Sequence, residues 1–509
     1  MTTPPPPAAL IPRPVLFWSG VALTFAGVLE HLRMFLECAP MNFDMSMMTM
    51  TPSMWAAMVV IAVGVVLSAL ALRQPAGTGP APSPAGAQTA ASRRRLIAIL
   101  SFALIVDQMK PATLAFVSPG MRQEYHLSAA EVAWLPTVAL TGTVLGSLVW
   151  GRAADRIGRR ATILLASLIF LGTTVCGAMP SFSGNLIMCA MMGMAAGGML
   201  PVVYALMTES LPPGRRAPIM VLQAGLTTTG GYMAASGLAA LLLPVSGWRM
   251  LWFAQLPPVL VLICLNRWIP ESAAFSAGKK RAIRVPAATL FRRPQTAKTL
   301  VVTAYGLGWG LVYWGFITFL PAQLEAAHGH GMSAATLLFL SSLLAIPTCA
   351  FAAWLYTRWS ARNTMVLYAG LTVTALLALA ALGLHDSGPL TLGIVMLLFA
   401  GTAGVIALLG PYTAEVFPTA LRGTAGGWVA AVGKSGGAFG PPLIALVLSA
   451  PGGMRTAALF VALPMAAAGM AVLARGSNPD TTQAAADDTQ LATELDGLLP
   501  NEEPAPARP

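Results

Sequence analysis

The ten residues GRAADRIGRR (151–160) decide the fold, because they place four arginines and one aspartate between two long apolar runs. Arginines in such a loop anchor it on one side of a membrane. Exposed ion pairs also break and re-form at modest cost, which suits a latch between two conformations. Topology alone explains the arginines but not the glycines at 151 and 158, so we expect a tight turn with a latch at this loop.

The composition indicates a membrane protein. Of the 509 residues, 56% are hydrophobic and only 10% are charged, and the mean hydropathy is +0.70. A soluble protein of this length needs far more surface charge. A helical span takes about 20 apolar residues, and the sequence contains fourteen such stretches. We therefore expect an all-α integral membrane protein.

The spans and the polar segments between them predict a domain order. The expected parts are two extra transmembrane helices with a Met-rich outer loop (1–75), a flexible linker (76–92), a first six-helix half (93–270), a basic loop (271–298), a second six-helix half (299–475) and a disordered tail (476–509).

The basic residues alternate between loops. The net charge of +11 comes from every second loop, including 93–95, 151–160 and 279–298, whereas the intervening loops hold little beyond Arg122, Arg249 and Arg455. This is the positive-inside pattern. It predicts cytoplasmic termini and a place in the plasma membrane, and it excludes nucleic acid as a partner.

The twelve-span region repeats itself at an offset of 206 residues. The pattern E-x-x-P-x-x-x-R occurs at 209–216 and again at 415–422. Gly230-Gly231 recur as Gly436-Gly437, and the same offset aligns Arg152 and Arg156 with Arg358 and Arg362. Two parallel six-helix halves of this kind enclose a site near the middle of the bilayer and rock about it.

The motif G-x-x-x-D-R-x-G-R-R at 151–160 resembles the loop signature of the major facilitator superfamily. The resemblance covers about residues 93–475; at the offset of 206, Thr357 and Ala361 stand where Gly151 and Asp155 would repeat. The E-x-x-P-x-x-x-R repeats, Pro270-Glu271-Ser272 and the glycine-rich run 433–437 are similar to segments of sugar porters and of metabolite–proton and aromatic-acid–proton symporters.

That resemblance implies a fold of two parallel six-helix repeats and a cytoplasmic network of ion pairs that gates it. Glu209 would pair with Arg216, and Glu415 with Arg422. The expected gating residues are Gly151, Asp155, Arg156, Gly158, Arg159, Arg160, Glu209, Arg216, Glu415 and Arg422.

Charged residues inside spans are the candidates for coupling. A mid-membrane charge costs about 3 kcal/mol on insertion scales. Asp107 and Lys110 lie three residues apart near the centre of the first superfamily span, beside Pro111. We expect them to share a helix face, with Asp107 carrying the proton and Lys110 responding to substrate. The alternative is a static pair that only permits insertion.

The expected substrate site combines a cation with aromatic walls. Lys434 lies deep in the eleventh superfamily span as an anion anchor or a structural partner. The seventh span carries an aromatic cluster that suits an amphipathic solute or the lipid interface. The predicted binding residues are Lys434, Tyr305, Trp309, Tyr313, Gln223, Thr227 and Tyr232, and Trp314 belongs to the same cluster.

The Met-rich segment before the linker is unusual. Eight methionines, His31 and Cys38 fall within 31–58. Sulfur and imidazole ligands favour soft metals such as Cu(I), but methionine is also a flexible apolar filler. We favour the filler and expect neither a metal site nor a cofactor here. His328 and His330 form a weaker candidate in another outer loop.

These features predict a transporter. The sequence contains no P-loop, no G-x-S-x-G with partners and no H-E-x-x-H, so an enzyme or an ATP-driven pump is not expected. We expect a monomeric secondary transporter that moves a small organic anion, an aromatic or other carboxylate, with protons. A proton-driven exporter and a soft-metal transporter remain as alternatives.

Overall fold

The computed structural model describes residues 13–41, 43, 45, 48–72, 90–212, 215–271, 287–327, 332–384, 388–418 and 421–478, without the side chains of Leu148, Arg152, Asp155 and Ala287. Throughout this described part the regular structure is helical, with no strand. Fourteen helices in it are long and apolar enough to cross a membrane, which is the number that the sequence predicted.

All the regular elements of the described residues are helical. They are α1 (Pro14–Glu37), η1 (Ala39–Met41), α2 (Pro52–Ala71), α3 (Ala90–Glu124), α4 (Ala129–Val132), α5 (Trp134–Ile157), α6 (Arg159–Gly172), η2 (Thr173–Ala178), α7 (Phe182–Ser210), α8 (Arg216–Ser246), α9 (Met250–Phe253), α10 (Leu256–Leu265), η4 (Asn266–Trp268), η5 (Ala287–Phe291), α12 (Thr296–Gly310), the π-helical η6 (Leu311–Phe316), η7 (Ile317–Phe319), α13 (Leu320–Ala327), α14 (Ala334–Arg358), α15 (Ala361–Leu382), α16 (Pro389–Val416), α17 (Arg422–Leu448) and α18 (Gly453–Arg475).

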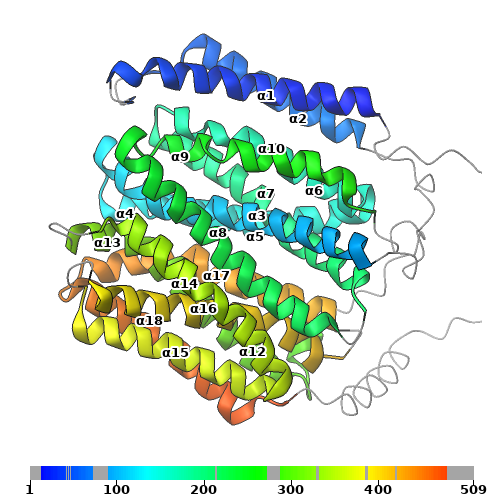
Figure 1. Cartoon of the computed structure of the whole chain (residues 1–509), viewed down its shortest axis with the longest axis vertical. Helices are drawn as coiled ribbons and strands as arrows, with labels where there is room; N and C mark the ends of the chain where they lie inside the picture. Colours follow the sequence, from blue (N-terminus) through cyan, green and yellow to red (C-terminus); the bar gives the residue numbers. More distant parts are fainter. Residues whose placement is uncertain are drawn as a thin grey trace, which may run out of the picture.

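The helices form two halves that lie side by side, α3 to α10 and α12 to α18 (Figure 1). Across the boundary α5 packs against α17, and α8 packs against α14. In the repeat, α5 corresponds to α14 and α8 corresponds to α17. The contact of α5 in one half with α17 is therefore matched by the contact of α14 in the other half with α8. The boundary therefore has the approximate two-fold symmetry that parallel repeats produce.

The structure corrects the register of the arginine loop in the second half. The helices α8 and α17 begin at Arg216 and Arg422, at the expected offset of 206. The helices α6 and α15 begin at 159 and 361, an offset of 202. The sequence alignment of Arg152 and Arg156 with Arg358 and Arg362 is thus wrong in space, because Arg156 and Arg160 occupy the equivalent places. Correspondingly, Thr357 replaces Asp155, and Ser360 replaces Gly158.

The arginine loops gather at one end of the bundle, the right-hand end in Figure 1, which we call the arginine-rich end.

Polar side chains fix several helix starts: Ser181, Ser333 and Ser360 each accept a hydrogen bond from the third helical N–H, as N-cap residues do. Gly158 instead joins α5 to α6 with φ of 94°, a conformation that favours glycine.

The two additional helices form a hairpin on the flank of the first half. In Figure 1, α1 and α2 lie along one edge of the molecule, and they pack on α6 and η2. Gly20 and Gly64 face each other so closely that a Cβ on either would strike the opposite backbone. The Ser68 hydroxyl donates to the Phe17 carbonyl across the seam at 3.3 Å. Small residues and interhelical hydrogen bonds of this kind hold helices together in lipid.

Candidate functional site

The boundary between the halves contains a buried carboxylate and a partly buried ammonium. Asp107 is 1% exposed on α3, and Lys434 lies on α17 of the other half. Their charges act on each other across the boundary, but among the described residues the two groups form no direct ion pair. Lys434 Nζ donates to Ser147 Oγ of α5 at 2.9 Å. This hydrogen bond links the two halves.

The Asp107 carboxylate is poorly satisfied. Its Oδ2 accepts from Gln108 Nε2 at 3.1 Å, whereas Oδ1 is buried without a hydrogen-bond partner. Burying an ionised carboxylate without full pairing is costly, so such a group tends to take up a proton. The Asp107 carboxylate therefore has one buried oxygen that the described protein atoms leave without a donor.

Lys110 points away from this boundary into the first half. Its Nζ donates to the Phe170 carbonyl at 2.7 Å and lies 5.5 Å from the centroid of the Phe170 ring. The carbonyl belongs to the last turn of α6, where a cation is favoured by the helix dipole. Among the described residues Asp107 and Lys110 form no ion pair, because the Lys110 ammonium is held by the Phe170 carbonyl, and the cation whose charge acts on Asp107 is Lys434.

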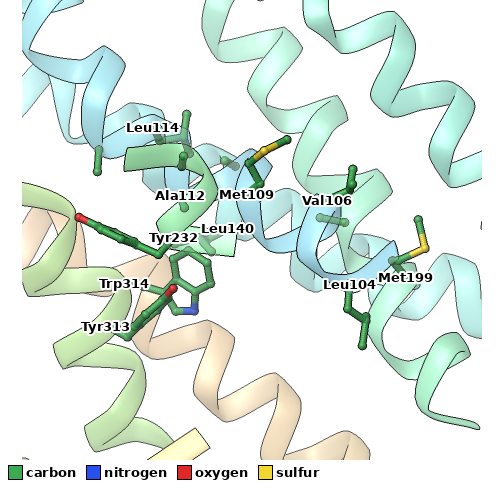
Figure 2. Packing of buried hydrophobic residues seen from close by; sticks show 14 of the residues in the cluster. Leu104, Val106, Met109, Ala112, Leu114, Leu140, Met199, Tyr232, Tyr313 and Trp314 are labelled. Carbon is green, nitrogen blue, oxygen red and sulfur yellow. The ribbon is translucent and has the colours of Figure 1, made fainter. Parts of the chain in front are cut away.

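An aromatic cavity lies one helical turn from these charges. It has room for about one water molecule, about 10 Å³, and is lined by Pro111, Ala112, Ala115, Tyr232, Tyr313, Trp314 and Thr318. Figure 2 shows Tyr232, Tyr313 and Trp314 gathered beside Ala112. Ligand pockets usually measure roughly 300–1,000 Å³, so in this conformation the cavity is too small for an organic ligand.

The predicted aromatic cluster divides into two parts. Tyr313 and Trp314 line the cavity, and Trp309 stacks on Tyr313 with ring centroids 5.2 Å apart. Tyr305 is directed into the second half, where its hydroxyl donates to the Met365 carbonyl at 2.9 Å. The Tyr313–Trp314 stretch is the π-helical η6, a distortion that is frequent at functional sites.

Unsatisfied donors lie around the same boundary. The buried Tyr232 hydroxyl, Gln223 Nε2 and Trp309 Nε1 have no hydrogen-bond partner. Gln223 Oε1 accepts from Ser101 Oγ at 2.8 Å, and Thr227 donates to the Gln223 carbonyl at 2.8 Å. Buried donors without partners are uncommon in native proteins and call for a ligand, an ion or water.

Several residues of this region were not found from the sequence. Ser147 and Ser101 carry no signal beyond being serines in spans, and Tyr204 of α7, which interacts with Thr227 and Asp107, has none either. Only their tertiary positions reveal them.

At the arginine-rich end, the turn between α5 and α6 is held by acidic side chains. The Arg159 guanidinium forms an ion pair with Glu209 of α7. The Arg159 main-chain N–H donates to Glu271 Oε1 at 2.8 Å, and that of Arg160 donates at 3.4 Å. The Glu271 carboxylate also packs against Gly158, so closely that a Cβ there would collide with it.

The other predicted residues of this loop are placed as follows. A Cβ at Gly151 would meet no atom within 4 Å, so the close approach expected at Gly151 occurs at Gly158 instead. Arg156 is exposed. Arg160 Nε donates to Asn266 Oδ1 at 2.9 Å. The Asp155 side chain lies outside the described part of the structure.

The repeated arginines bind backbone at equivalent places. Arg216 Nε donates to the Leu211 carbonyl at 2.9 Å, and Arg422 Nε donates to the Phe417 carbonyl at 3.2 Å. These carbonyls belong to the C-caps of α7 and α16. Each arginine thus ties the start of its helix to the end of the preceding one.

Glu415 has a different hydrogen-bond partner from its counterpart Glu209. It accepts a hydrogen bond from the Tyr356 hydroxyl of α14. The charge of Glu415 also interacts with that of Arg422, so these two residues attract each other as expected. Glu209, in contrast, forms its ion pair with Arg159.

In each half, a residue three positions after the last helical segment accepts hydrogen bonds from the turn before the third span. In the first half this residue is Glu271, after η4. In the second it is Asn478, after α18, whose Oδ1 accepts from Ser360 Oγ at 2.6 Å and from the Arg362 N–H at 3.3 Å. Asn478 falls in the segment expected to be disordered, so the sequence gave no reason to select it.

A buried polar network lies at the opposite end of the first half. Arg249 donates to Glu124 with Nη2···Oε1 of 2.6 Å, and its Nη1 donates to the Gly177 and Met179 carbonyls at 2.9 Å each. The Met45 N–H of the Met-rich loop reaches Glu124 Oε1 at 3.3 Å. The loop between α1 and α2 is therefore attached to this network.

The Met-rich loop is packed against the protein. Met45 and Met54 are fully buried, and the Cys38 thiol contacts the Met48 sulfur at 3.3 Å. Within the described ranges, no group of three His, Cys, Asp or Glu side chains is placed to hold a metal. His328 and His330 lie outside the described residues.

Two halves of six membrane-spanning helices each, about an approximate two-fold axis and with charged residues at their boundary, are the arrangement of a membrane transporter. Residues 96–441 match the model of the Major Facilitator Superfamily. The chain belongs to this family and is not an enzyme.

Named relatives support this assignment. A protein of Bacillus subtilis named for niacin/nicotinamide transport is 28% identical, over 70% of this chain and 90% of its own. A cis,cis-muconate transport protein of Acinetobacter baylyi is 27% identical, over 68% and 86%. A 3-(3-hydroxy-phenyl)propionate transporter of Escherichia coli is 27% identical, over 78% and 98%.

The fold also resembles a solved structure. The crystal structure of a D-xylose-proton symporter matches with a TM-score of 0.63 at 13% identity, over 76% of this chain and 98% of that one. At this identity the likeness concerns the fold alone.

Proposed function

We propose that this protein carries a small aromatic carboxylate across the plasma membrane together with a proton, by alternating access between its two halves. The observation that supports this most is the charge couple of Asp107 and Lys434 at the boundary of the halves, beside an aromatic cavity. The relatives named for niacin, muconate and hydroxyphenylpropionate fit a carboxylate substrate.

Substrate and proton are coupled through Lys434. When a carboxylate binds the Lys434 ammonium, the attraction between Lys434 and Asp107 is shared with a second anion. Asp107, buried with one unpartnered oxygen, then takes up a proton, because two carboxylates around one ammonium cannot both remain favourably ionised. The loaded boundary carries little net charge, which lowers the barrier to moving it through the membrane.

The ring of the substrate occupies the aromatic cavity. Pro111 and Ala112 form one wall on α3, and Tyr313 and Trp314 form another on η6. These walls belong to different halves, so a bound ring contacts both. Rocking of the halves then exposes the ring to one side of the membrane at a time.

The arginine-rich end is the cytoplasmic gate in this proposal. The positive-inside distribution favours that orientation. The ion pair of Arg159 with Glu209 holds α6 to α7 in the present conformation and exchanges partners as the halves rock. Ion pairs that solvent still reaches are weak individually, and this pair is partly exposed, so it changes partner without a large barrier.

The test uses purified protein in proteoliposomes with labelled 4-hydroxybenzoate or nicotinate and an imposed pH gradient. Wild-type protein accumulates the acid when the trans side is alkaline. Asp107→Asn should retain exchange of labelled for unlabelled acid but lose accumulation driven by the gradient. Lys434→Ala should lose binding, exchange and accumulation.

The matched control is Arg455→Ala, which changes an exposed residue outside the cavity lining and should behave as wild type. Gradient-driven accumulation that persists in Asp107→Asn would refute the coupling. Competition by lipophilic cations but not by carboxylates would favour the exporter alternative.

A further inference from the structure

We infer that the site selects aromatic acids that bear a second polar group on the ring, and that the Tyr232 hydroxyl recognises that group. This inference rests on the proposed function, because it assigns the carboxylate to Lys434 and the ring to the aromatic cavity. The polar group is a hydroxyl or a ring nitrogen, placed away from the carboxylate.

The cavity contains three hydroxyl groups, of which two are engaged by the protein. Tyr313 donates to the Thr228 carbonyl at 3.3 Å, and Thr318 donates to the Trp314 carbonyl at 2.6 Å. The hydroxyl of Tyr232 has no partner, although the residue is only 2% exposed. The protein thus leaves one hydrogen-bonding group of the cavity open.

The Tyr232 ring is held in place by other rings. Its centroid lies 4.7 Å from that of Phe399, 5.6 Å from that of Phe116 and 6.5 Å from that of Tyr313. These residues come from three further elements, α16, α3 and η6. Packing on several sides fixes the ring, so the hydroxyl cannot turn away to find water or another protein group.

The remaining lining makes an unsatisfied hydroxyl costly. Pro111, Ala112 and Ala115 offer no side-chain hydrogen bond. A buried polar group without a partner loses its hydration without compensation. In the empty cavity a water molecule can serve, whereas a ring that displaces this water must replace its hydrogen bond. An acid with a hydroxyl or a ring nitrogen does so, and benzoate does not.

The two polar contacts lie in opposite halves. Lys434 belongs to α17, one helical turn before Gly437, where a Cβ would crowd Trp314 of the cavity. Tyr232 belongs to α8 of the first half. A ring between them presents its carboxylate to one half and its second polar group to the other. Substituents adjacent to the carboxylate do not reach Tyr232 in this arrangement.

The chain supplies a matched pair of variants. Tyr232→Phe removes the open hydroxyl, and Tyr313→Phe removes an engaged hydroxyl from the same cavity. Uptake into proteoliposomes is measured for 3-hydroxybenzoate, 4-hydroxybenzoate, nicotinate and benzoate, each with its KM and maximal rate. Thermal unfolding of each variant is measured alongside.

Wild type should favour the substituted acids over benzoate by about tenfold in KM, the effect of one hydrogen bond. Tyr232→Phe should reduce this preference to within about threefold, by raising the KM of the substituted acids while that of benzoate stays constant. Its unfolding temperature should not fall, because the lost hydroxyl had no partner. Tyr313→Phe should keep the preference.

The outcomes separate the two proposals. If none of the acids is transported and Lys434→Ala changes nothing, the proposed function fails. If the acids are transported, but wild type does not favour the substituted ones or Tyr232→Phe keeps the wild-type preference, only the inference on Tyr232 is overturned. A loss of preference in Tyr313→Phe alone would assign the recognition to that residue instead.

Discussion

Replacing Arg249 should destabilise the protein far more than replacing its repeat counterpart. Arg249 is 1% exposed. Its guanidinium contacts Glu124, the Tyr125 hydroxyl and the carbonyls of Gly177 and Met179. The variant Arg249→Met removes the donor that these acceptors share. Arg455, at the equivalent repeat position, is exposed.

The magnitude follows from what remains after the change. Breaking a buried ion pair by removing one partner costs about 3–5 kcal/mol, because the other charge stays buried. Glu124 keeps two donors, Trp248 Nε1 at 2.8 Å and the Met45 N–H at 3.3 Å. We therefore expect a loss near the lower end, about 3 kcal/mol. Arg455→Met should stay within about 0.5 kcal/mol, as surface substitutions usually do.

The assay is thermal unfolding of the purified protein in one detergent, followed by tryptophan fluorescence for wild type and both variants. Arg249→Met should unfold several degrees lower, and Arg455→Met should match wild type. Adding Glu124→Gln to Arg249→Met should recover part of the loss, since the uncompensated charge is then gone. Equal unfolding temperatures for the two single variants would refute the reasoning.

Three further changes test other parts of the structure. Gly158→Ala should lower the free energy of unfolding by about 1–3 kcal/mol and should also slow transport, because its φ of 94° and its contact with Glu271 both oppose a Cβ. An unfolding temperature and an uptake rate equal to those of wild type would contradict this. Asn478→Ala should reduce the maximal transport rate with little change in KM. The control Ser477→Ala should leave the rate unchanged, because Ser477 contacts Tyr412 only through its backbone O and N–H. Equal maximal rates for the two variants would show that Asn478 has no part in the gate. Gly437→Leu should abolish binding of aromatic acids in a thermal-shift assay, because its side chain would enter the space of the cavity wall; a ligand shift like that of wild type would show that the ring binds elsewhere.

The span count and the repeat could be predicted because both depend on local composition. Apolar stretches long enough to cross a bilayer are visible in the sequence, and the structure contains fourteen of them. The paired starts of α8 and α17 keep the predicted offset. The turn before α15 does not, because the helix boundary there is set by Ser360 as N-cap and not by the positions of the arginines.

The partners of the buried charges could not be predicted from spacing alone. Asp107 and Lys110 are close in sequence, but the helix turns them toward different neighbours, and only the packing of α3 decides which. The carbonyl that receives Lys110 and the lysine that acts on Asp107 lie 60 and more than 300 residues away. The hydrogen bonding of Tyr232 and Tyr313 could not be predicted either. Both are tyrosines within spans, but only the Tyr313 hydroxyl has a backbone carbonyl, that of Thr228, close enough to accept its hydrogen bond.

The close seam between α1 and α2 has a consequence for how the protein is made. Its contacts join residues of neighbouring helices, such as Gly20 with Gly64 and Phe17 with Ser68. They can form as soon as the second helix has entered the bilayer, during synthesis. The surfaces that hold the hairpin to the rest of the protein, on α6, η2 and Glu124, are synthesised later. The growing chain is thus anchored in the membrane by a closed pair of helices before the span that carries the buried Asp107 and Lys110 has to be inserted.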